Sequence, residues 1–295
     1  MYTPTAKGYF SGCGGMELGM LQAGVNVIQS LDLDVEATNC MKRNAHYFSH
    51  DVLNVDIKDK TVLEQPATDI IVGTYPCTKY SAIADIHGTR TGDDLFLHFF
   101  RHIAIERPEM YIVENVPGMK KFQVVMEAMT KLPDYYVTVF CPVDACNWLP
   151  QRRKRLILFG TKKPYSISSP KQLNNKPRLK DILEENPYVE MPDYVISRIN
   201  GKYRDLPIIV DPDDHSVMAP TCVAHYAKDL GTRLVKDQKA KYGLRPFSVR
   251  EYARLQGFPD DFKFENRRSS YKLIGNAVPV NMGEWIGSEA IKYFN

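Results

Sequence analysis

A cysteine and a carboxyl group each follow an apolar run of the sequence, and together they could carry out covalent chemistry on a bound ligand. Cys77 comes shortly after the run 69–73, within Tyr-Pro-Cys-Thr-Lys-Tyr-Ser. As a thiolate it would be a nucleophile. Glu114 ends the next apolar run and could act as an acid beside the thiol. Taken singly, Cys77 could also be a buried apolar cysteine and Glu114 a helix cap or ion-pair partner.

A glycine-rich turn follows the first apolar run and could hold a nucleotide-like ligand. Residues 10–19 read Phe-Ser-Gly-Cys-Gly-Gly-Met-Glu-Leu-Gly and open a helical pattern. Such turns let backbone amides approach a ligand closely. Asp32 follows about 20 residues later, where an acidic side chain can bind ribose hydroxyls. The spacing is not that of a dinucleotide fingerprint, so an adenosine ligand, a nicotinamide enzyme and a plain tight turn all stay open.

A basic run precedes another apolar segment. Residues 151–155 read Gln-Arg-Arg-Lys-Arg and lead into Leu-Ile-Leu. We expect at least Arg155 to be drawn inward, where a guanidinium can fix a base carbonyl or a phosphate. The alternative is a solvated basic surface.

The elements that must position these groups alternate along the first half of the chain. Apolar strand-like runs alternate with helical spacing, which predicts a doubly wound α/β domain. The expected strands are 8–10, 25–31, 69–73, 110–114, 135–141 and 155–159, and the expected helices are 16–23, 35–44, 95–106 and 124–132.

The pattern of residues changes after residue 162. Up to about residue 244 prolines are frequent and no period is sustained, which is typical of a loop-rich second domain. Helical patterns return at 248–255 and 280–293, and the last is long enough to pack on the first domain. We therefore expect a catalytic and cofactor-binding domain at 1–163, a small domain at 164–262 and a returning segment at 263–295.

Composition narrows the class of protein but does not identify a binding partner. The 295 residues are 44% hydrophobic and 25% charged, with a net charge of +3, which says little about nucleic acid. No apolar stretch approaches the length of a membrane span, and residues 1–7 lack the apolar core of a secretion signal. Six cysteines lack paired spacing, which argues against a disulfide framework and a zinc site. We expect a soluble, cytoplasmic protein with no metal.

Taken together, the motifs resemble those of the DNA (cytosine-5) methyltransferase family. Six segments occur in the family's order over nearly the whole chain: Phe-Ser-Gly-Cys-Gly-Gly-Met-Glu at 10–17, Pro-Cys at 76–77, Glu-Asn-Val at 114–116, Gln-Arg-Arg-Lys-Arg at 151–155, Arg-Leu-Gln-Gly-Phe-Pro at 254–259 and Gly-Asn-Ala-Val-Pro at 275–279. A nicotinamide enzyme has no need of the last five. The resemblance implies the Rossmann-like sheet of S-adenosylmethionine-dependent methyltransferases, with a smaller loop-rich target-recognition domain.

The resemblance also implies a cofactor site. The cofactor would be S-adenosylmethionine, with S-adenosylhomocysteine as the product. Asp32 would hold the ribose hydroxyls, and Asp51, with Val52 beside it, would read the adenine amino group. The other implied cofactor residues are Phe10, Gly12, Gly14, Gly15, Pro76, Leu95 and Asn276.

Catalysis would fall to Cys77, Glu114, Arg153 and Arg155 by the same resemblance. The thiolate of Cys77 would add to carbon 6 of cytosine, Glu114 would bind ring nitrogen 3 and the exocyclic amine, and Arg155 would hold the carbonyl at position 2. The target base must be flipped out of double-stranded DNA. The implied DNA-binding residues are Thr78, Ser81, Gln151 and Arg152. A monomer is expected, with a cognate restriction endonuclease as a further partner.

The chain departs from the family pattern at one position near the nucleophile. Thr78 stands where the family has glutamine, which affects the expected DNA contacts more than the chemistry. The recognition segment, about 165–244, is short, which predicts a short target sequence. The alternatives are a transfer RNA cytosine-5 methyltransferase, although its Cys-Phe-Thr signature is not found here, a non-catalytic DNA-binding homologue, and an enzyme that uses a modified methyl donor.

Overall fold

The computed structural model describes residues 1–76, 95–189, 191–265 and 267–295. Cys77, Thr78 and Ser81 therefore lie outside the described residues. The chain divides into two compact units, which are described separately. Unit 1 comprises residues 1–144, 154–170 and 280–295, and unit 2 comprises 145–153 and 171–279. None of the described helices is both long and apolar enough to cross a membrane.

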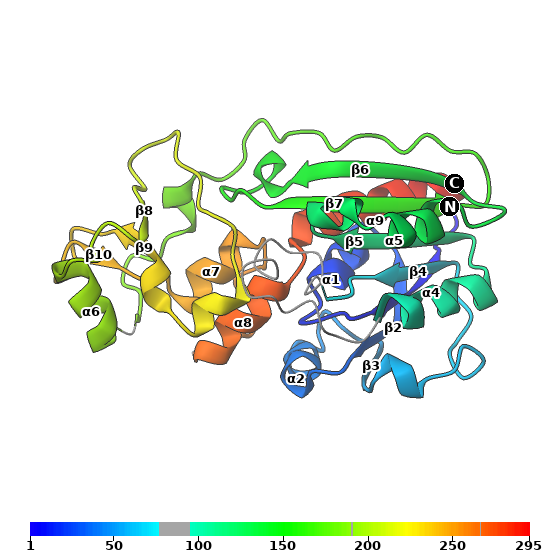
Figure 1. The fold of residues 1–295 in the computed structure, drawn as a ribbon, viewed down its shortest axis with the longest axis horizontal. Helices are drawn as coiled ribbons and strands as arrows, with labels where there is room; N and C mark the ends of the chain where they lie inside the picture. Colours follow the sequence, from blue (N-terminus) through cyan, green and yellow to red (C-terminus); the bar gives the residue numbers. More distant parts are fainter. Residues whose placement is uncertain (77–94, 190, 266) are drawn as a thin grey trace. The chain divides into compact units, whose positions relative to one another are not determined.

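Unit 1 is built on a seven-stranded sheet with the order β3-β2-β1-β4-β5-β7-β6 (Figure 1). The first five of these positions are parallel, whereas β7 runs antiparallel to both β5 and β6. This confirms the predicted α/β class. The strands are β1 (Thr5–Tyr9), β2 (Asn26–Asp32), β3 (Asp51–Asn54), β4 (Ile70–Gly73), β5 (Met110–Asn115), β6 (Tyr136–Asp144) and β7 (Lys154–Thr161).

Burial explains why the central strands read as unbroken apolar runs. Every residue of β4 and β5 is buried, as expected for parallel strands covered on both faces. The covering helices are α1 (Gly15–Gln22), α2 (Val35–Arg43), α4 (Leu95–Glu106), α5 (Gln123–Thr130) and α9 (Val280–Phe294). Tyr9, Phe99 and Tyr111 belong to one core cluster that joins β1, α4 and β5.

The direction of the chain reverses at the centre of this sheet. From β1 the chain passes outward through β2 to β3, and it then returns to place β4 on the other side of β1. Open α/β sheets bind ligands outside the carboxyl ends of the strands at such a reversal. The glycine-rich turn after β1 and the segment from Thr74 to Pro76 after β4 both leave the sheet at this point.

Unit 2 combines a small sheet with short helices. Its three strands have the order β10-β9-β8 (Figure 1), with β8 (Ile208–Val210) parallel and β10 (Leu244–Arg245) antiparallel to β9 (Arg233–Lys236). The helices are α6 (Asp193–Asn200), α7 (Val249–Leu255) and α8 (Arg268–Asn276). The rings of Tyr226 and Tyr252 stack at 4.9 Å between centroids, and Tyr271 packs edge-on against both.

The boundaries of the units differ from those expected at 163/164 and 262/263. Residues 164–170 stay with unit 1, where the Ser168 amide donates to Glu289 of α9 at 2.7 Å. Residues 263–279 belong to unit 2, because α8 packs on α7 and on the 3-10 helix η5 (Ala224–Ala227). Only α9, from Val280 onward, returns to unit 1.

Candidate active site

The glycine-rich turn is fastened to the end of β2 by one carboxylate. The Gly12 amide donates to Asp32 Oδ2 at 2.7 Å, and the Asp34 amide donates to Asp32 Oδ1 at 2.7 Å. Gly12 and Gly14 have φ of 57° and 85°, in the left-handed region that glycine adopts without strain. Asp32 thus lies beside the turn, as the sequence predicts, and Gly15 begins α1 directly after it.

Phe10 joins this turn to the segment that leads toward Cys77. Phe10 has a φ of 62°, and its carbonyl accepts a hydrogen bond from Thr74 Oγ1 at 2.8 Å. Its ring meets the Tyr75 ring edge-on at 6.3 Å between centroids. Leu95, the first residue of α4, packs against the same core cluster as Phe10. The predicted cofactor residues Phe10, Leu95 and Pro76, which is exposed, therefore come from adjoining parts of unit 1.

Asn115 braces the backbone just before the predicted nucleophile. Its Nδ2 donates to the Tyr75 carbonyl at 3.1 Å, and its Oδ1 accepts from the Val116 amide at 2.9 Å. Asn115 is buried at the end of β5. The sequence predicted no role for Asn115, although it is the middle residue of the Glu-Asn-Val motif. It ties the end of β5 to the segment that continues into Pro76 and Cys77.

Glu114 and Arg155, which the sequence places far apart, form an ion pair in unit 1. Arg155 Nε lies 2.7 Å from Glu114 Oε1, and both side chains are about one-tenth exposed. Glu114 is in β5 and Arg155 in β7, and these strands pair so that Asn115 faces Leu156. Arg155 Nη1 also donates to the Lys154 carbonyl at 2.8 Å. The pair leaves a carboxyl group and a guanidinium next to each other at the end of β5, beside β4.

Arg153 belongs to unit 2, and its guanidinium forms hydrogen bonds within that unit. Its side chain is 2% exposed and donates to the carbonyls of Cys222 at 2.6 Å, Gly275 at 3.1 Å and Ala277 at 2.8 Å. The last two acceptors flank the carboxyl end of α8, where backbone carbonyls lack helical partners. These donors give Arg153 a structural role in unit 2, and its catalytic role stays a prediction.

Gln151, a predicted DNA-binding residue, is likewise structural. It is fully buried, its Nε2 donates to the Leu255 carbonyl at 2.6 Å, and its Oε1 accepts from the Cys222 amide at 2.8 Å. A polar group held this way cannot also reach a DNA strand. Arg152 between them is exposed and stays a candidate for DNA contact, and Asn276 is an exposed residue of unit 2 at the end of α8.

Asp51 and Val52 do not lie at the edge that carries Asp32. Asp51 begins β3 opposite Gln29, whereas Asp32 ends β2 opposite Asn54. A separation of three strand residues corresponds to about 10 Å. Asp56 follows β3 at that edge, because the amide of the preceding residue, Val55, donates to the Asp32 carbonyl at 3.2 Å. The signal that could have indicated Asp56 is its place directly after a short apolar run, in Asp-Ile-Lys at 56–58.

Comparison with known proteins decides the family. Residues 8–292 match the family described as C-5 cytosine-specific DNA methylase. The chain belongs to this family. It is 29% identical to the type II methyltransferase M.NgoPII of Neisseria gonorrhoeae, over 96% of this chain and 94% of that protein. It is 30% identical to M.BsuFI of Bacillus subtilis, over 92% of this chain and 69% of that protein.

A solved structure supports the fold. A methyltransferase of Entamoeba histolytica superposes with a TM-score of 0.82 over 100% of both chains, at 17% identity. Unit 1 thus has the α/β fold with a mainly parallel sheet that S-adenosylmethionine-dependent methyltransferases share. The chain is an S-adenosylmethionine-dependent DNA cytosine-5 methyltransferase. In the part of the chain that the structure describes, no group of three or more His, Cys, Asp or Glu side chains could hold a metal ion.

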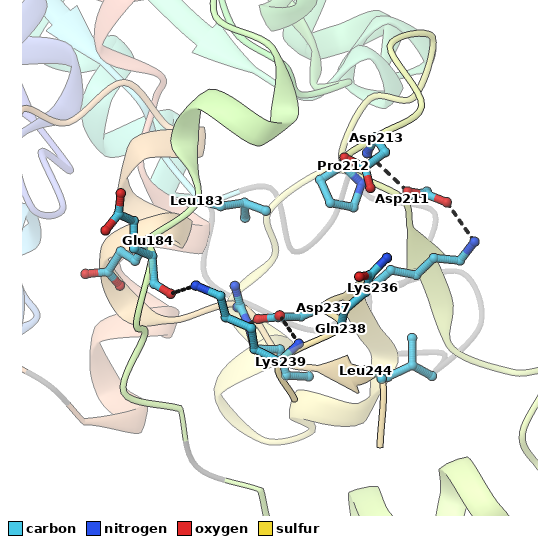
Figure 2. A pocket seen from close by; sticks show the side chains of 13 residues that line it. Leu183, Glu184, Asp211, Pro212, Asp213, Lys236, Asp237, Gln238, Lys239 and Leu244 are labelled. Atoms are coloured by element: carbon cyan, nitrogen blue, oxygen red, sulfur yellow. Dashed lines mark hydrogen bonds and ion pairs between the residues drawn. The ribbon is translucent and has the colours of Figure 1, made fainter. Parts of the chain in front are cut away.

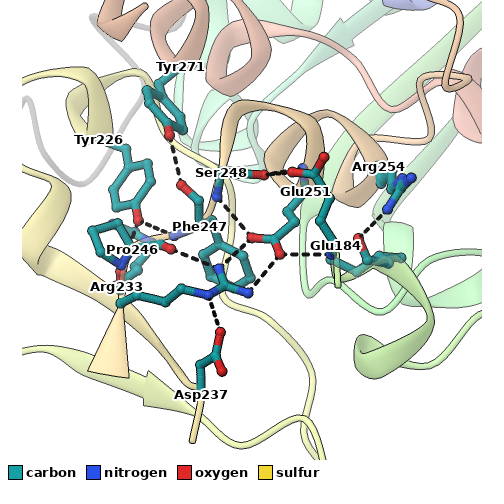
Figure 3. Close-up of polar contacts among 12 residues, drawn as sticks. Glu184, Tyr226, Arg233, Asp237, Pro246, Phe247, Ser248, Glu251, Arg254 and Tyr271 are labelled. Carbon is teal, nitrogen blue, oxygen red and sulfur yellow. Dashed lines mark hydrogen bonds and ion pairs between the residues drawn. The ribbon is translucent and has the colours of Figure 1, made fainter. Parts of the chain in front are cut away.

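Unit 2 of this methyltransferase is held by a buried ionic network (Figure 3). Arg245 donates to both carboxylate oxygens of Glu251 at 2.8 Å, and its Nε donates to Asp237 at 2.6 Å. The same Glu251 forms a capping box with Ser248 at the start of α7. Each charged group therefore has a partner of opposite sign, which lowers the cost of burying it.

A cavity of about 550 Å³ lies beside this network (Figure 2). Three cations line it, and each already has an acceptor: Lys236 with Asp211 at 2.7 Å, Lys239 with the Glu185 carbonyl at 3.3 Å, and Arg245 in the network above. Glu184 and Asp213 add further acidic groups to the wall. This balance does not favour an anion such as a DNA phosphate.

Proposed function

We propose that this methyltransferase acts on carbon 5 of a flipped cytosine through a covalent adduct with Cys77. The observation that carries the proposal is the ion pair of Glu114 and Arg155 at 2.7 Å, at the end of the strand beside β4. The chain runs directly from β4 through Thr74, Tyr75 and Pro76 to Cys77. A carboxyl group and a guanidinium are the two groups that would bind the edge of a cytosine ring.

The residues around the glycine-rich turn fit S-adenosylmethionine. A carboxylate has about four lone-pair sites, so Asp32 can hold the turn and still accept ribose hydroxyls. Phe10, Gly12, Gly14 and Gly15 would line the cofactor. We replace Asp51 by Asp56 as the acidic residue for the adenine amino group, and retain Pro76, Leu95 and Asn276 as proposed contacts.

The chain's own groups would act in sequence. The thiolate of Cys77 adds to carbon 6 of cytosine, and Glu114 donates a proton or a hydrogen bond to ring nitrogen 3 as negative charge develops. Arg155 holds the carbonyl at position 2 and fixes the carboxyl of Glu114. The bound cofactor supplies an electrophilic methyl group to carbon 5. Loss of the proton from carbon 5 then expels the thiolate and restores the aromatic ring.

The test is a trapped adduct. Duplex DNA containing 5-fluorocytosine should form a denaturation-resistant complex with the wild type in the presence of cofactor, because fluorine at carbon 5 cannot leave as a proton does. Cys77→Ser should form none, whereas Cys146→Ser, which changes a partly buried cysteine of unit 2, should still be trapped. Absence of an adduct with wild-type protein would contradict the mechanism. Adducts with transfer RNA alone would favour an RNA substrate.

The remaining expectations concern the DNA partner. We infer that the target sequence is short, that the base is flipped out at a cost of about a few kcal/mol, and that Arg152 contacts the DNA backbone. Thr78 and Ser81 stay proposed DNA contacts. Several relatives are named type II methyltransferases, which supports a cognate endonuclease that acts on the same site. We further propose that the protein acts as a monomer.

A further inference from the structure

Glu17 is a buried carboxyl group of unit 1 that the proposed mechanism does not use. It lies in the first turn of α1, directly after the glycine-rich turn, and is 2% exposed. A side chain at Gly8 of β1 would collide with Glu17 Oε1 and with the Ser11 hydroxyl, so both groups lie against the end of β1. Among the described residues, Oε2 of Glu17 finds no hydrogen-bond partner.

The surroundings of Glu17 bring the pKa of its carboxyl group close to neutral pH. Burial is the main cause that raises the pKa of Glu17 to about 7, and the negative charge of Asp32 adds to it. The Ser11 hydroxyl and the backbone amide of Glu17 itself act in the opposite direction. The other titratable group that faces Glu17 is Cys13, a fully buried thiol whose pKa burial raises well above its usual value. No cation balances Glu17 within the described part of unit 1.

We propose that Glu17 is a positioning residue of the cofactor turn whose carboxyl loses its proton when S-adenosylmethionine binds. The inference rests on the proposed cofactor site, because the ligand would supply the positive charge that balances the carboxylate of Glu17. S-Adenosylmethionine carries a sulfonium cation, and a buried carboxylate attracts such a charge strongly where water is excluded. S-Adenosylhomocysteine has the same adenosine and amino acid groups but no sulfonium. Glu17 therefore discriminates the methyl donor from the product.

Linkage gives the sign and size of the effect. A cation that lowers the pKa of Glu17 must release a proton on binding, and its affinity must rise with pH through the range where the free protein loses that proton. Because the free carboxyl titrates at about 7, S-adenosylmethionine should release up to about half a proton at pH 7. Between pH 8 and pH 6 its affinity should fall several-fold more than that of S-adenosylhomocysteine.

The experiment is isothermal titration calorimetry of both ligands at pH 7, in two buffers that differ in ionisation enthalpy. The difference in heat between buffers counts the protons released. Wild type, Glu17→Gln and the exposed control Glu127→Gln on α5 are compared. The wild type and the control should release more protons with S-adenosylmethionine than with S-adenosylhomocysteine, and Glu17→Gln should abolish the difference. Titration of the amino groups of the ligands does not depend on residue 17, so the comparison of wild type with Glu17→Gln removes it.

Each outcome bears on a different claim. Equal proton release for the two ligands with wild-type protein would overturn the inference without any variant, and so would an unchanged difference in Glu17→Gln. Failure of either ligand to bind would instead contradict the proposed cofactor site. A purely structural role would lower the stability of Glu17→Gln and weaken both ligands equally. Thermal unfolding of this variant checks that point, since glutamine resembles the neutral form of the acid.

Discussion

Arg153 and Arg155 are two residues apart, and the alternation of side chains along the chain turns both inward. Residues 152 and 154, which alternate with them, are exposed. Arg153 meets three backbone carbonyls of unit 2, whereas Arg155 meets the carboxylate of Glu114 in unit 1. Arg153 therefore donates to neutral backbone acceptors of unit 2, whereas Arg155 lies next to a titratable group of the proposed active site.

Matched lysine substitutions should separate these roles. Arg153→Lys removes the planar fork that reaches three carbonyls, and buried carbonyls left without donors cost about 1–3 kcal/mol. We expect a clear fall in the unfolding temperature. Arg155→Lys keeps a cation beside Glu114 but loses the Nε contact, so we expect nearly unchanged stability and a roughly 10- to 100-fold lower kcat.

Thermal unfolding and single-turnover methyl transfer measure the two effects. Arg152→Lys, at the exposed position directly before Arg153, serves as the control and should leave the unfolding temperature unchanged. The interpretation fails if Arg153→Lys is as stable as the wild type but loses methyl transfer at saturating ligand.

The sequence could predict Arg155 but not the surroundings of Arg153. Arg155 begins an apolar strand, and Glu114 ends another, so their meeting follows from the sheet. The acceptors of Arg153 lie at residues 222, 275 and 277, and nothing local indicates that they converge. A run of Gln-Arg-Arg-Lys-Arg resembles a basic surface because its alternate burial depends on these distant contacts. The position of Asp51 could not be predicted for a similar reason, because no strand was expected at 51–54 and the edge at which β3 ends was therefore unknown.

At the scale of elements, α1 and α9 pack closely because both carry glycines. A Cβ atom at Gly19 would lie within 2.6 Å of the backbone of Gly283, and one at Gly287 would lie 2.9 Å from Met20 Cα. Real Cβ atoms do not approach backbone so closely, so larger residues would force the helices apart. The helix that follows the cofactor turn is thereby seated against the last helix of the chain.

Gly19→Ala should destabilise unit 1 by about 1–3 kcal/mol. Alanine favours a helix over glycine by roughly 1 kcal/mol, so a loss of stability must come from the overlap with α9. Urea unfolding of wild type, Gly19→Ala and Gln22→Ala, an exposed position of the same helix, measures it. A stabilised Gly19→Ala would show that the two helices can separate without cost.

Elements with a buried apolar run, a clear period or a cap were predicted, and elements without such a signal were not. The helix expected at 248–255 appears as α7, with Ser248 at its N-cap. The missed elements are β3, α6, α8 and the small sheet of unit 2, whose strands have two to four residues. Segments this short cannot display a period, and their pairing partners fix them. The start of α8 also lacks a side-chain cap, so no local signal marked it.

At the scale of the molecule, unit 1 contains two histidines that are kept neutral by burial. Burial, together with the smaller effect of the positive charges of Arg101, Lys7 and His98, lowers the pKa of His102 from 6.5 to about 4. Burial also lowers the pKa of His50 to about 4. Tyr9 hydrogen-bonds Nδ1 of His102 at 3.0 Å, and Ser30 hydrogen-bonds Nε2 of His50 at 2.7 Å.

Unit 1 should therefore lose stability in mild acid. The pKa of each histidine is lower in the folded protein than in the unfolded chain. Above about pH 6.5 both states hold the histidines neutral, so these groups do not reduce the stability of unit 1 there. The stability falls as the pH decreases toward 4, by on the order of 3 kcal/mol for His102. The two tryptophans allow a local measurement, since Trp285 is in unit 1 and Trp148 in unit 2. Fluorescence of Trp285 in a Trp148→Phe background should show the unfolding midpoint falling between pH 7 and pH 5.

His102→Gln in that background should reduce the pH dependence, because glutamine does not titrate. An unfolding midpoint that stays constant down to pH 5, or that falls equally in the variant, would argue against this origin of the acid sensitivity. The Trp285→Phe background gives the corresponding curve for unit 2 through Trp148.

The path of the chain between the units has a consequence for biosynthesis. Unit 1 is completed only by α9, the last element, whose residues Met282, Ile286 and Ala290 are buried. While the ribosome is still translating unit 2, the nascent unit 1 lacks α9. The face of α1 that carries Gly19 is then uncovered. Exposed apolar surface of this kind is what chaperones bind. The surface that supports the cofactor turn is thus complete only after α9 has been translated.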